Sequence, residues 1–186
     1  MKLIILDRDG VINRDSDAFI KSPDEWIPIP GSLEAIARLN QAGYRVAIAT
    51  NQSGVARGLL DIVTLNAIHQ KLHTAAQQAG ADIDAIFFCP HAAIDNCDCR
   101  KPKPGMLRAI GKRFNVSLKD APTVGDSLRD LQAGFVVGCA PYLVLTGKGE
   151  ATRNKGGLPP GTLIFENLSA VADHLLSATD AKIPAR

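Results

Sequence analysis

Short apolar runs alternate along this chain with longer segments in which apolar residues recur at helical spacing. The short runs are rich in β-branched and aromatic residues, which favour strands. Such alternation predicts the α/β class, a parallel sheet flanked by helices on both faces. We expect strands at Lys2 to Leu6, Tyr44 to Ala49, Ala85 to Phe88, a run ending at Gly125, Tyr142 to Leu145 and Leu163 to Phe165.

The longer segments are expected to be helices, and the first of them stops before Gly43, a residue type common just past helix ends. The stretch from Gly147 to Gly161 is rich in Gly, Pro and Lys and predicts a surface loop. We expect one domain over residues 1–186, with a frayed tail from about residue 178. Helices are predicted at Leu33 to Gln41, Thr64 to Gln78, Pro104 to Phe114, Ser127 to Val137 and Leu168 to Leu176.

The composition narrows the class of protein. The 186 residues are 46% hydrophobic and 22% charged, as in globular domains large enough to bury a core. The net charge is only +2 and Lys and Arg are scattered, so we predict no nucleic-acid partner. The opening run Leu3 to Leu6 is too short for a signal peptide or a membrane span. We therefore expect a cytoplasmic monomer with no membrane partner.

Acidic residues follow two of the predicted strands. In parallel α/β sheets, ligands bind beyond the carboxyl ends of the strands. Asp7 and Asp9 alternate along extended chain, so both carboxylates can reach one site, and Asp126 follows the fourth strand. Three converging carboxylates suit Mg²⁺, although any one of them alone could be an ordinary turn former. Asp130, one helical turn further on, is either a support for this site or a solvated acid.

A cluster of cysteines follows the third predicted strand. Three thiols and one imidazole lie close together in the sequence, which is the ligand set of a closed structural zinc site. Incidental cysteines or a redox role are the alternatives, but the chain has no Cys-x-x-Cys pair. A filled site would shape the loop that leads into Arg100 and Lys101. The predicted zinc ligands are Cys89, His91, Cys97 and Cys99.

Four segments carry a resemblance: LDRDGVIN, TNQSG, RKPKPG and VGDSLRD, in this order. Together they resemble the haloacid dehalogenase superfamily of phosphotransferases, and the likeness covers nearly the whole chain. It implies a Rossmann-like sheet and covalent catalysis in which Asp7 attacks phosphorus. Asp9 would act as acid and base, and Asp7, the carbonyl of Asp9 and Asp126 would bind Mg²⁺. Thr50 and Lys101 would stabilise the transferring phosphoryl group.

Within the superfamily, the same motifs and the cysteine loop are similar to a family of phosphatases that act on a heptose 1,7-bisphosphate, a precursor of lipopolysaccharide. This resemblance implies a member without a cap domain and a phosphorylated sugar as substrate. Histidinol-phosphate phosphatases are the nearest alternative, and an inactive module that binds a phosphorylated ligand is another. The residues expected to contact the substrate are Arg8, Asp15, Ser16, Asp17, Asn51, Gln52, Ser53 and Arg100.

Overall fold

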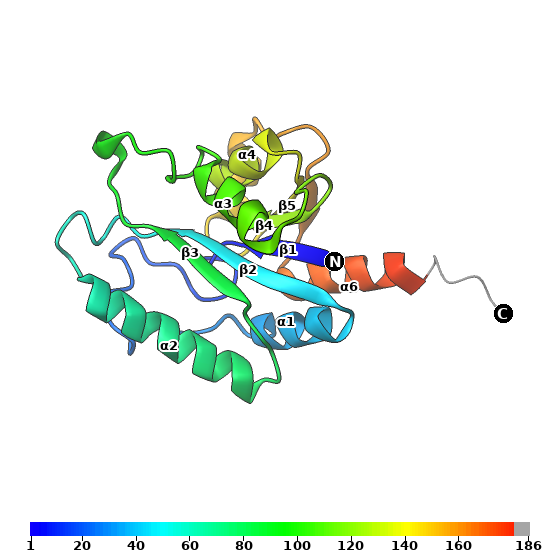
Figure 1. Cartoon of the computed structure of the whole chain (residues 1–186), viewed down its shortest axis with the longest axis horizontal. Coiled ribbons are helices and arrows are strands. Elements are labelled where there is room, and N and C mark those ends of the chain that lie inside the picture. Colours follow the sequence, from blue (N-terminus) through cyan, green and yellow to red (C-terminus); the bar gives the residue numbers. More distant parts are fainter. Residues whose placement is uncertain (181–186) are drawn as a thin grey trace.

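The computed structural model describes residues 1–180 and contains one parallel sheet of six strands in the order β3-β2-β1-β4-β5-β6 (Figure 1). Each neighbouring pair runs parallel, which confirms the α/β prediction. The strands are β1 (Lys2–Leu6), β2 (Tyr44–Asn51), β3 (Ala85–Cys89), β4 (Pro122–Gly125), β5 (Ala140–Val144) and β6 (Leu163–Phe165).

Helices cover both faces of this sheet. The helices α1, α2 and α6 lie on one face, and α3 and α4 lie on the other (Figure 1). A single-turn 3-10 helix, η1, interrupts the loop between β3 and α3. The helices are α1 (Ser32–Gln41), α2 (Ile62–Gln78), η1 (Ala93–Asp95), α3 (Gly105–Phe114), α4 (Leu128–Val136), α5 (Gly149–Lys155) and α6 (Leu168–Asp180).

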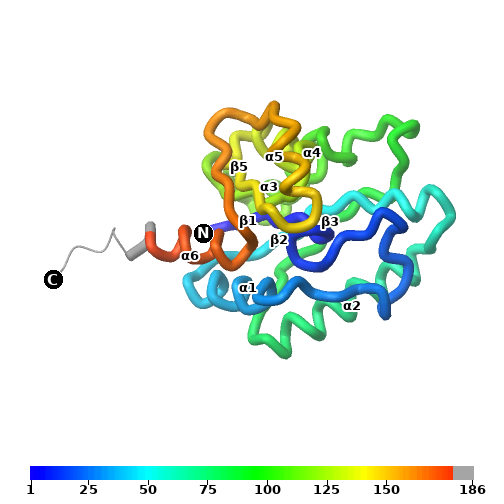
Figure 2. Tube along the Cα trace, turned by 180° about the vertical axis from the view of Figure 1, so that it is seen from behind, coloured from blue at the N-terminus to red at the C-terminus, as the bar shows by residue number. Residues whose placement is uncertain are grey.

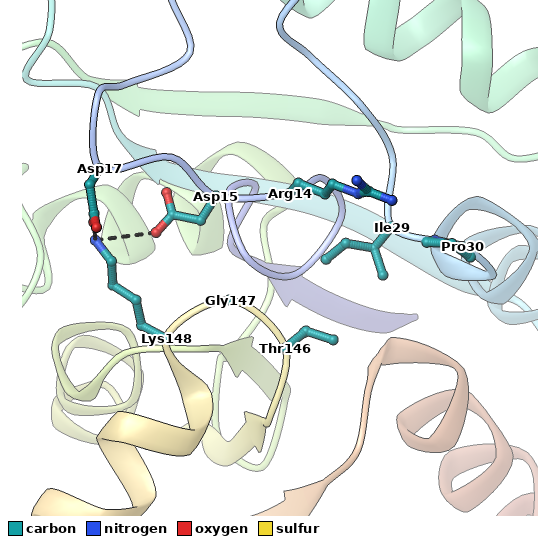
Figure 3. Close-up of a pocket in the computed structure, with 8 residues that line it drawn as sticks. All are labelled: Arg14, Asp15, Asp17, Ile29, Pro30, Thr146, Gly147 and Lys148. Carbon is teal, nitrogen blue, oxygen red and sulfur yellow. Dashed lines mark ion pairs between the residues drawn. The ribbon is translucent and has the colours of Figure 1, made fainter.

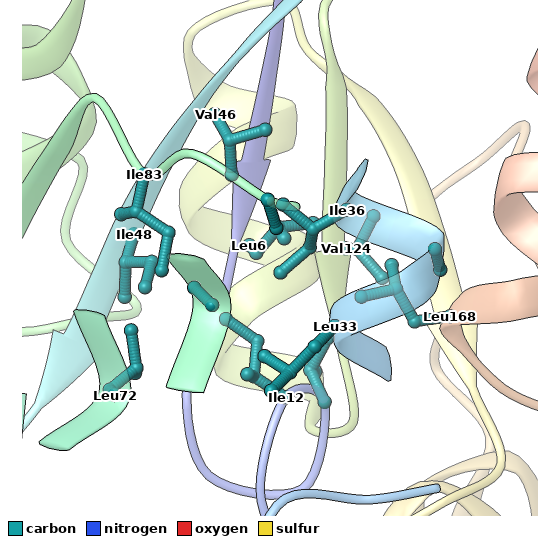
Figure 4. Packing of buried hydrophobic residues seen from close by; sticks show 14 of the residues in the cluster. Leu6, Ile12, Leu33, Ile36, Val46, Ile48, Leu72, Ile83, Val124 and Leu168 are labelled. Carbon is teal, nitrogen blue, oxygen red and sulfur yellow. The ribbon is translucent and has the colours of Figure 1, made fainter. Parts of the chain in front are cut away.

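The central strands contribute side chains to two hydrophobic cores, because alternate side chains of a strand point to opposite faces. Ile4 and Leu6 of β1 pack with α1, α2 and α6, as Figure 4 shows for Leu6. Leu3 and Ile5 pack on the other face, with residues of α3 and α4. Burial on both faces is the physical reason that β1 reads as a continuous apolar run.

Several predicted boundaries shift by one or more residues; for example, α2 begins at Ile62 and β5 spans Ala140–Val144. The strand β2 extends to Asn51, two residues past the expected end, and the closing helix α6 continues to Asp180. The predicted loop from Gly147 to Gly161 contains the helix α5 (Figure 2). Of the tail expected to fray from about residue 178, residues 178–180 belong to α6, and residues 181–186 lie outside the described part. Within residues 1–180, no helix is long and apolar enough to cross a membrane.

The carboxyl ends of β1, β2 and β4 open toward the same edge of the sheet, where the long loop after β1 meets the segment between β5 and α5 (Figure 2). Thr146 donates a hydrogen bond of 2.6 Å to the carbonyl of Gly10 and ties these two segments together. This edge collects most of the polar residues predicted at strand ends.

Candidate active site

The first predicted acid, Asp7, lies at the floor of a cavity, where β1 ends. Its backbone N–H donates to the carbonyl of Val124 in β4, which holds the residue in line with the sheet. The ammonium of Lys101 lies 3.0 Å from one carboxylate oxygen of Asp7, and both side chains are buried. A buried carboxylate with a cation beside it and one face toward a cavity has the chemistry that a nucleophile for an anionic group requires.

Three buried carboxylates cluster around this point. Oxygens of Asp7, Asp126 and Asp130 all lie within 4.8 Å of one another. Burial, followed by the charge of Asp130, raises the pKa of Asp7 to about 7. Burial, Asp130 and Asp7 raise the pKa of Asp126 to about 8. Like charges this close in a dry site require a cation, and a set of hard oxygen donors fits Mg²⁺.

Asp130 belongs to this cluster and is not a solvated helix acid. Only 1% of its surface is exposed, and its carboxylate lies 2.6 Å from the ammonium of Lys101. The hydroxyl of Ser127 donates a second hydrogen bond of 2.6 Å. Although burial opposes ionisation, Lys101 and then Arg129 hold the pKa of Asp130 below its usual value. Asp130 therefore fixes Lys101 beside Asp7.

Asp126 is enclosed by two loops from other strands. Gly10 has a φ of 82°, and a side chain there would collide with the Asp126 carboxylate, as would one at Gly147. The backbone N–H of Lys148 donates to Asp126 at 2.8 Å, and the hydroxyl of Thr152 donates to its carbonyl at 2.8 Å. These contacts aim the carboxylate at Asp7.

The carboxylate of Asp9 lies beside this cluster and is held by three side chains. Arg8 donates to both of its oxygens, at 2.9 and 3.1 Å, Asn13 donates at 2.9 Å and Gln52 at 2.8 Å. Burial opposes ionisation, but the Arg8 charge and these hydrogen bonds lower the pKa of Asp9 overall. The carboxylate is therefore fixed in orientation at the cavity wall.

Arg8, which the sequence predicts as a substrate contact, lies apart from the cavity. Its side chain is fully buried beneath Asp9 and does not line the cavity. One guanidinium nitrogen lies 3.3 Å from Nε2 of His69, in the middle of α2. Burial, followed by the Arg8 charge, lowers the pKa of His69 to about 4, so the imidazole is neutral and accepts this hydrogen bond.

Residues at the end of β2 position Lys101 and bring Thr50 to the site. The side-chain amide of Asn51 donates to the backbone carbonyl of Lys101 and accepts from its N–H, both at 3.1 Å. The ammonium of Lys101 also donates to the carbonyl of Ala49 at 2.6 Å. The amide of Gln52 donates to the Thr50 hydroxyl at 2.9 Å. Lys101 is therefore held by Ala49 and Asn51, the two residues that flank Thr50 in β2.

The cavity above Asp7 measures about 220 Å³ and brings most of the predicted residues together. Sequence reasoning missed several of its lining residues, because none of them lies directly at a predicted strand end. The predicted residues that line it are Asp7, Asp9, Asp15, Ser16, Asp17, Thr50, Asn51, Gln52, Ser53 and Arg100. The residues that were missed are Phe19, Ile20, Arg57, Arg129 and Lys148.

An adjoining hollow of about 430 Å³ lies between the loop after β1 and the segment after β5. The ammonium of Lys148 bridges Asp15 and Asp17 at 3.2 Å each, as the dashed lines in Figure 3 show. The hollow and the cavity above Asp7 share these three residues. The bridge therefore lies between the two spaces and links their walls.

The four predicted zinc ligands converge at the end of β3. Their sulfur and nitrogen atoms lie 3.3 to 3.6 Å apart in five of the pairs. Around a tetrahedral zinc with bonds of about 2.0 to 2.3 Å, ligand atoms are separated by roughly 3.5 to 3.8 Å. The cluster therefore fits a closed zinc site of Cys89, His91, Cys97 and Cys99. A guanidinium nitrogen of Arg100 donates to the carbonyl of His91 at 3.1 Å, which joins this loop to the cavity wall.

A parallel α/β sheet with a buried aspartate at the end of its first strand, a paired lysine and an acidic cation site defines a hydrolase of the aspartate-nucleophile phosphotransferase class. The comparison with protein families agrees. The chain belongs to the haloacid dehalogenase-like hydrolases, whose family model matches residues 1–138. The resemblance predicted from the four motifs is confirmed, and the protein is a phosphoric monoester hydrolase.

Similar proteins align over nearly the whole chain. A protein of Bordetella bronchiseptica named D-glycero-β-D-manno-heptose-1,7-bisphosphate 7-phosphatase is 64% identical over 176 residues, 95% of this chain and 98% of that protein. A Pseudomonas aeruginosa protein of the same name is 58% identical, over 94% and 97%. The crystal structure of the D,D-heptose 1,7-bisphosphate phosphatase from B. bronchiseptica with magnesium and phosphate has a TM-score of 0.94 and 63% identity, and covers 96% of this chain and 99% of that one.

Proposed function

We propose that this protein is a magnesium-dependent phosphatase that releases the 7-phosphate of D-glycero-β-D-manno-heptose 1,7-bisphosphate through a phosphoaspartate on Asp7. The observation that carries the proposal is the buried pair of Asp7 and Lys101, 3.0 Å apart, at the floor of a cavity lined by several cations. The substrate is taken from the relatives, which share more than half of their residues with this chain. Their names also specify the β anomer, which the sequence left open.

In the first half of the reaction, an oxygen of Asp7 attacks the phosphorus, an acyl phosphate forms and the bond from phosphorus to the sugar oxygen breaks. Asp9 gives its proton to the departing sugar oxygen. The incoming phosphate is anionic, and a negative charge next to Asp9 raises the pKa of its carboxyl, which favours the protonated form at this step. The hydrogen bonds from Arg8, Asn13 and Gln52 keep that group in place.

In the second half, Asp9 takes a proton from a water molecule, the water oxygen attacks the phosphorus and the bond to Asp7 breaks. Inorganic phosphate leaves and both carboxylates return to their starting states. Lys101 and the Thr50 hydroxyl face the three transferring oxygens and stabilise their charge in both steps. Asp7, Asp126 and the Asp9 carbonyl would hold a Mg²⁺ ion, whose charge would offset the repulsion between the anionic nucleophile and the phosphate.

The zinc loop serves the site indirectly. When all four side chains bind zinc, the ion has no open coordination position, so the role of this loop is structural. Arg100 lines the cavity and donates to the His91 carbonyl of this loop, which supports the proposal that its guanidinium contacts the substrate. The cytoplasmic location and the monomeric state expected from the sequence stay predictions.

Phosphate release from heptose 1,7-bisphosphate and from histidinol phosphate, measured side by side with Mg²⁺, tests the proposal. We expect a strong preference for the bisphosphate and no turnover by Asp7→Asn, which keeps the shape of the side chain. A preference for histidinol phosphate would overturn the substrate but keep the chemistry. Absence of turnover on both would favour a module that only binds phosphorylated ligands.

A further inference from the structure

The cavity above Asp7 is lined by four cationic side chains, Arg57, Arg100, Arg129 and Lys148. Lys101 is buried beside Asp7 and is not among the lining residues. Three of the four already have partners. Lys148 bridges Asp15 and Asp17, Arg100 donates to the His91 carbonyl, and the Arg57 guanidinium lies 5.6 Å from the centre of the Phe19 ring.

Arg129 differs from these three. Its Nε is buried and has no hydrogen-bond partner. Within residues 1–180, no carboxylate oxygen lies within the 4.0 Å of an ion pair with its guanidinium, and the guanidinium donates no hydrogen bond. A buried guanidinium donor without a partner is costly, because the group loses water without gaining an acceptor. Arg129 therefore has donors available for an anion that enters the cavity.

The charges around Arg129 indicate which anion this is. The acids whose charges act on Arg129 include Asp7 and Asp15, and both line the same cavity as Arg129, Asp7 at the reaction centre and Asp15 in the loop after β1. The phosphate that reacts already has Lys101, 3.0 Å from Asp7. Arg129 is held farther than an ion-pair distance from Asp7. Its fork of donors therefore suits an oxyanion that is bound at the same time but elsewhere in the cavity.

We infer that Arg129 is a specificity-determining residue that binds the second, non-reacting phosphate of the substrate. The inference rests on the proposed function and deepens it, because it assigns a contact that selects a sugar bisphosphate over a monophosphate. Arg129 follows Leu128, the first residue of α4, and its neighbour Asp130 is fixed by Lys101 and Ser127. The backbone at Arg129 is therefore held at the site, so phosphate binding costs little conformational entropy of the chain.

The test compares two substrates that share the reacting phosphate, heptose 1,7-bisphosphate and heptose 7-phosphate. For Arg129→Gln, we expect kcat/KM on the bisphosphate to fall roughly 10- to 150-fold, the loss of a hydrogen bond between charged groups. The loss should appear mainly in KM, and kcat/KM on the monophosphate should change less than about threefold. Arg129→Lys keeps the positive charge but lacks the planar set of guanidinium donors, so its kcat/KM on the bisphosphate should lie between those of the wild type and Arg129→Gln.

Exposed Arg113 in α3 provides the matched control, because Arg113→Gln makes the same chemical change away from the cavity and should leave both substrates unaffected. Equal losses of Arg129→Gln on the two substrates, or no loss on either, would overturn the inference while the proposed function stands. A wild-type enzyme that releases no phosphate from the bisphosphate would overturn the proposed function, and the inference with it. If Arg129→Gln does not fold, the same test uses Arg129→Lys. A larger fall of its kcat/KM on the bisphosphate than on the monophosphate supports the inference, and equal values of the fall overturn it.

Discussion

Asp7→Asn should abolish turnover and also make the magnesium-free protein more stable above neutral pH. The pKa of Asp7 is about 7 in the folded protein against an ordinary value of 3.8. The folded state therefore binds the proton more tightly than the unfolded chain, so stability is lost as the pH rises from about 4 to about 8. One pKa unit corresponds to about 1.4 kcal/mol, so the raised pKa of Asp7 costs the metal-free fold, relative to strongly acidic pH, about 4 kcal/mol at pH 8 and about 2 kcal/mol at pH 5.

A neutral Asn removes this pH-dependent cost, while its side-chain oxygen can still accept from Lys101 and from the backbone N–H of Arg8. Any change in packing adds a constant that is independent of pH. The informative quantity is therefore the difference in unfolding free energy between variant and wild type, which should grow by about 2 kcal/mol from pH 5 to pH 8.

Urea unfolding at a series of pH values measures this difference, in buffer without magnesium and without a chelator, so that the zinc loop keeps its metal. Saturating Mg²⁺ should reverse the order, because the ion binds the folded wild type better and stabilises it by mass action. Parallel stability curves for the two proteins between pH 5 and pH 8 would refute the reasoning, since they would mean that Asp7 ionises without cost.

Three further predictions concern residues around the nucleophile. Lys101→Met should lower kcat by about 100-fold or more in a phosphate-release assay, because a fixed cation at the transition state is lost, and an unchanged kcat would remove Lys101 from the mechanism. Cys97→Ser should reduce zinc content and the melting temperature, measured by metal analysis and calorimetry, and should raise KM as Arg100 loses its support; a zinc-free variant with the wild-type KM would contradict this. His69→Leu should lower kcat roughly tenfold at constant KM, because Arg8 loses an acceptor, whereas His69→Gln should restore most of the rate; equal rates in the two variants would show that the hydrogen bond is unimportant.

Much of the fold could be predicted because the sheet is buried on both faces. The apolar run of β1 can only be satisfied between two layers of helices. The helix α5 could not be predicted, since its sequence GEATRNK has no apolar stripe and its only buried residue is Gly149. It is tied to the fold by tertiary contacts such as that of Thr152 with the Asp126 carbonyl. Periodicity carries no information about such a helix.

The same distinction applies to the site. Asp7, Asp9 and Asp126 are identified by strand-end position and spacing, whereas Arg129 and Lys148 approach the cavity only through tertiary structure. The alternation that places Asp7 and Asp9 on one side of the extended chain also places the intervening Arg8 on the other, which agrees with its burial away from the cavity. Helical spacing could not decide between a supporting role and a solvated position for Asp130, because that choice depends on whether its side chain is buried.

The enclosure of Asp126 by Gly10, Gly147 and Lys148 has a consequence for the order of folding. A cation site that needs the loops after β1 and β5 together cannot form in a partly folded chain that has paired only some of its strands. Recovery of activity after dilution from denaturant therefore reports the last stage of sheet assembly rather than the first collapse. An intermediate with native-like helix content but without the contact of Lys148 with Asp126 will be spectroscopically similar to the native protein and enzymatically inert.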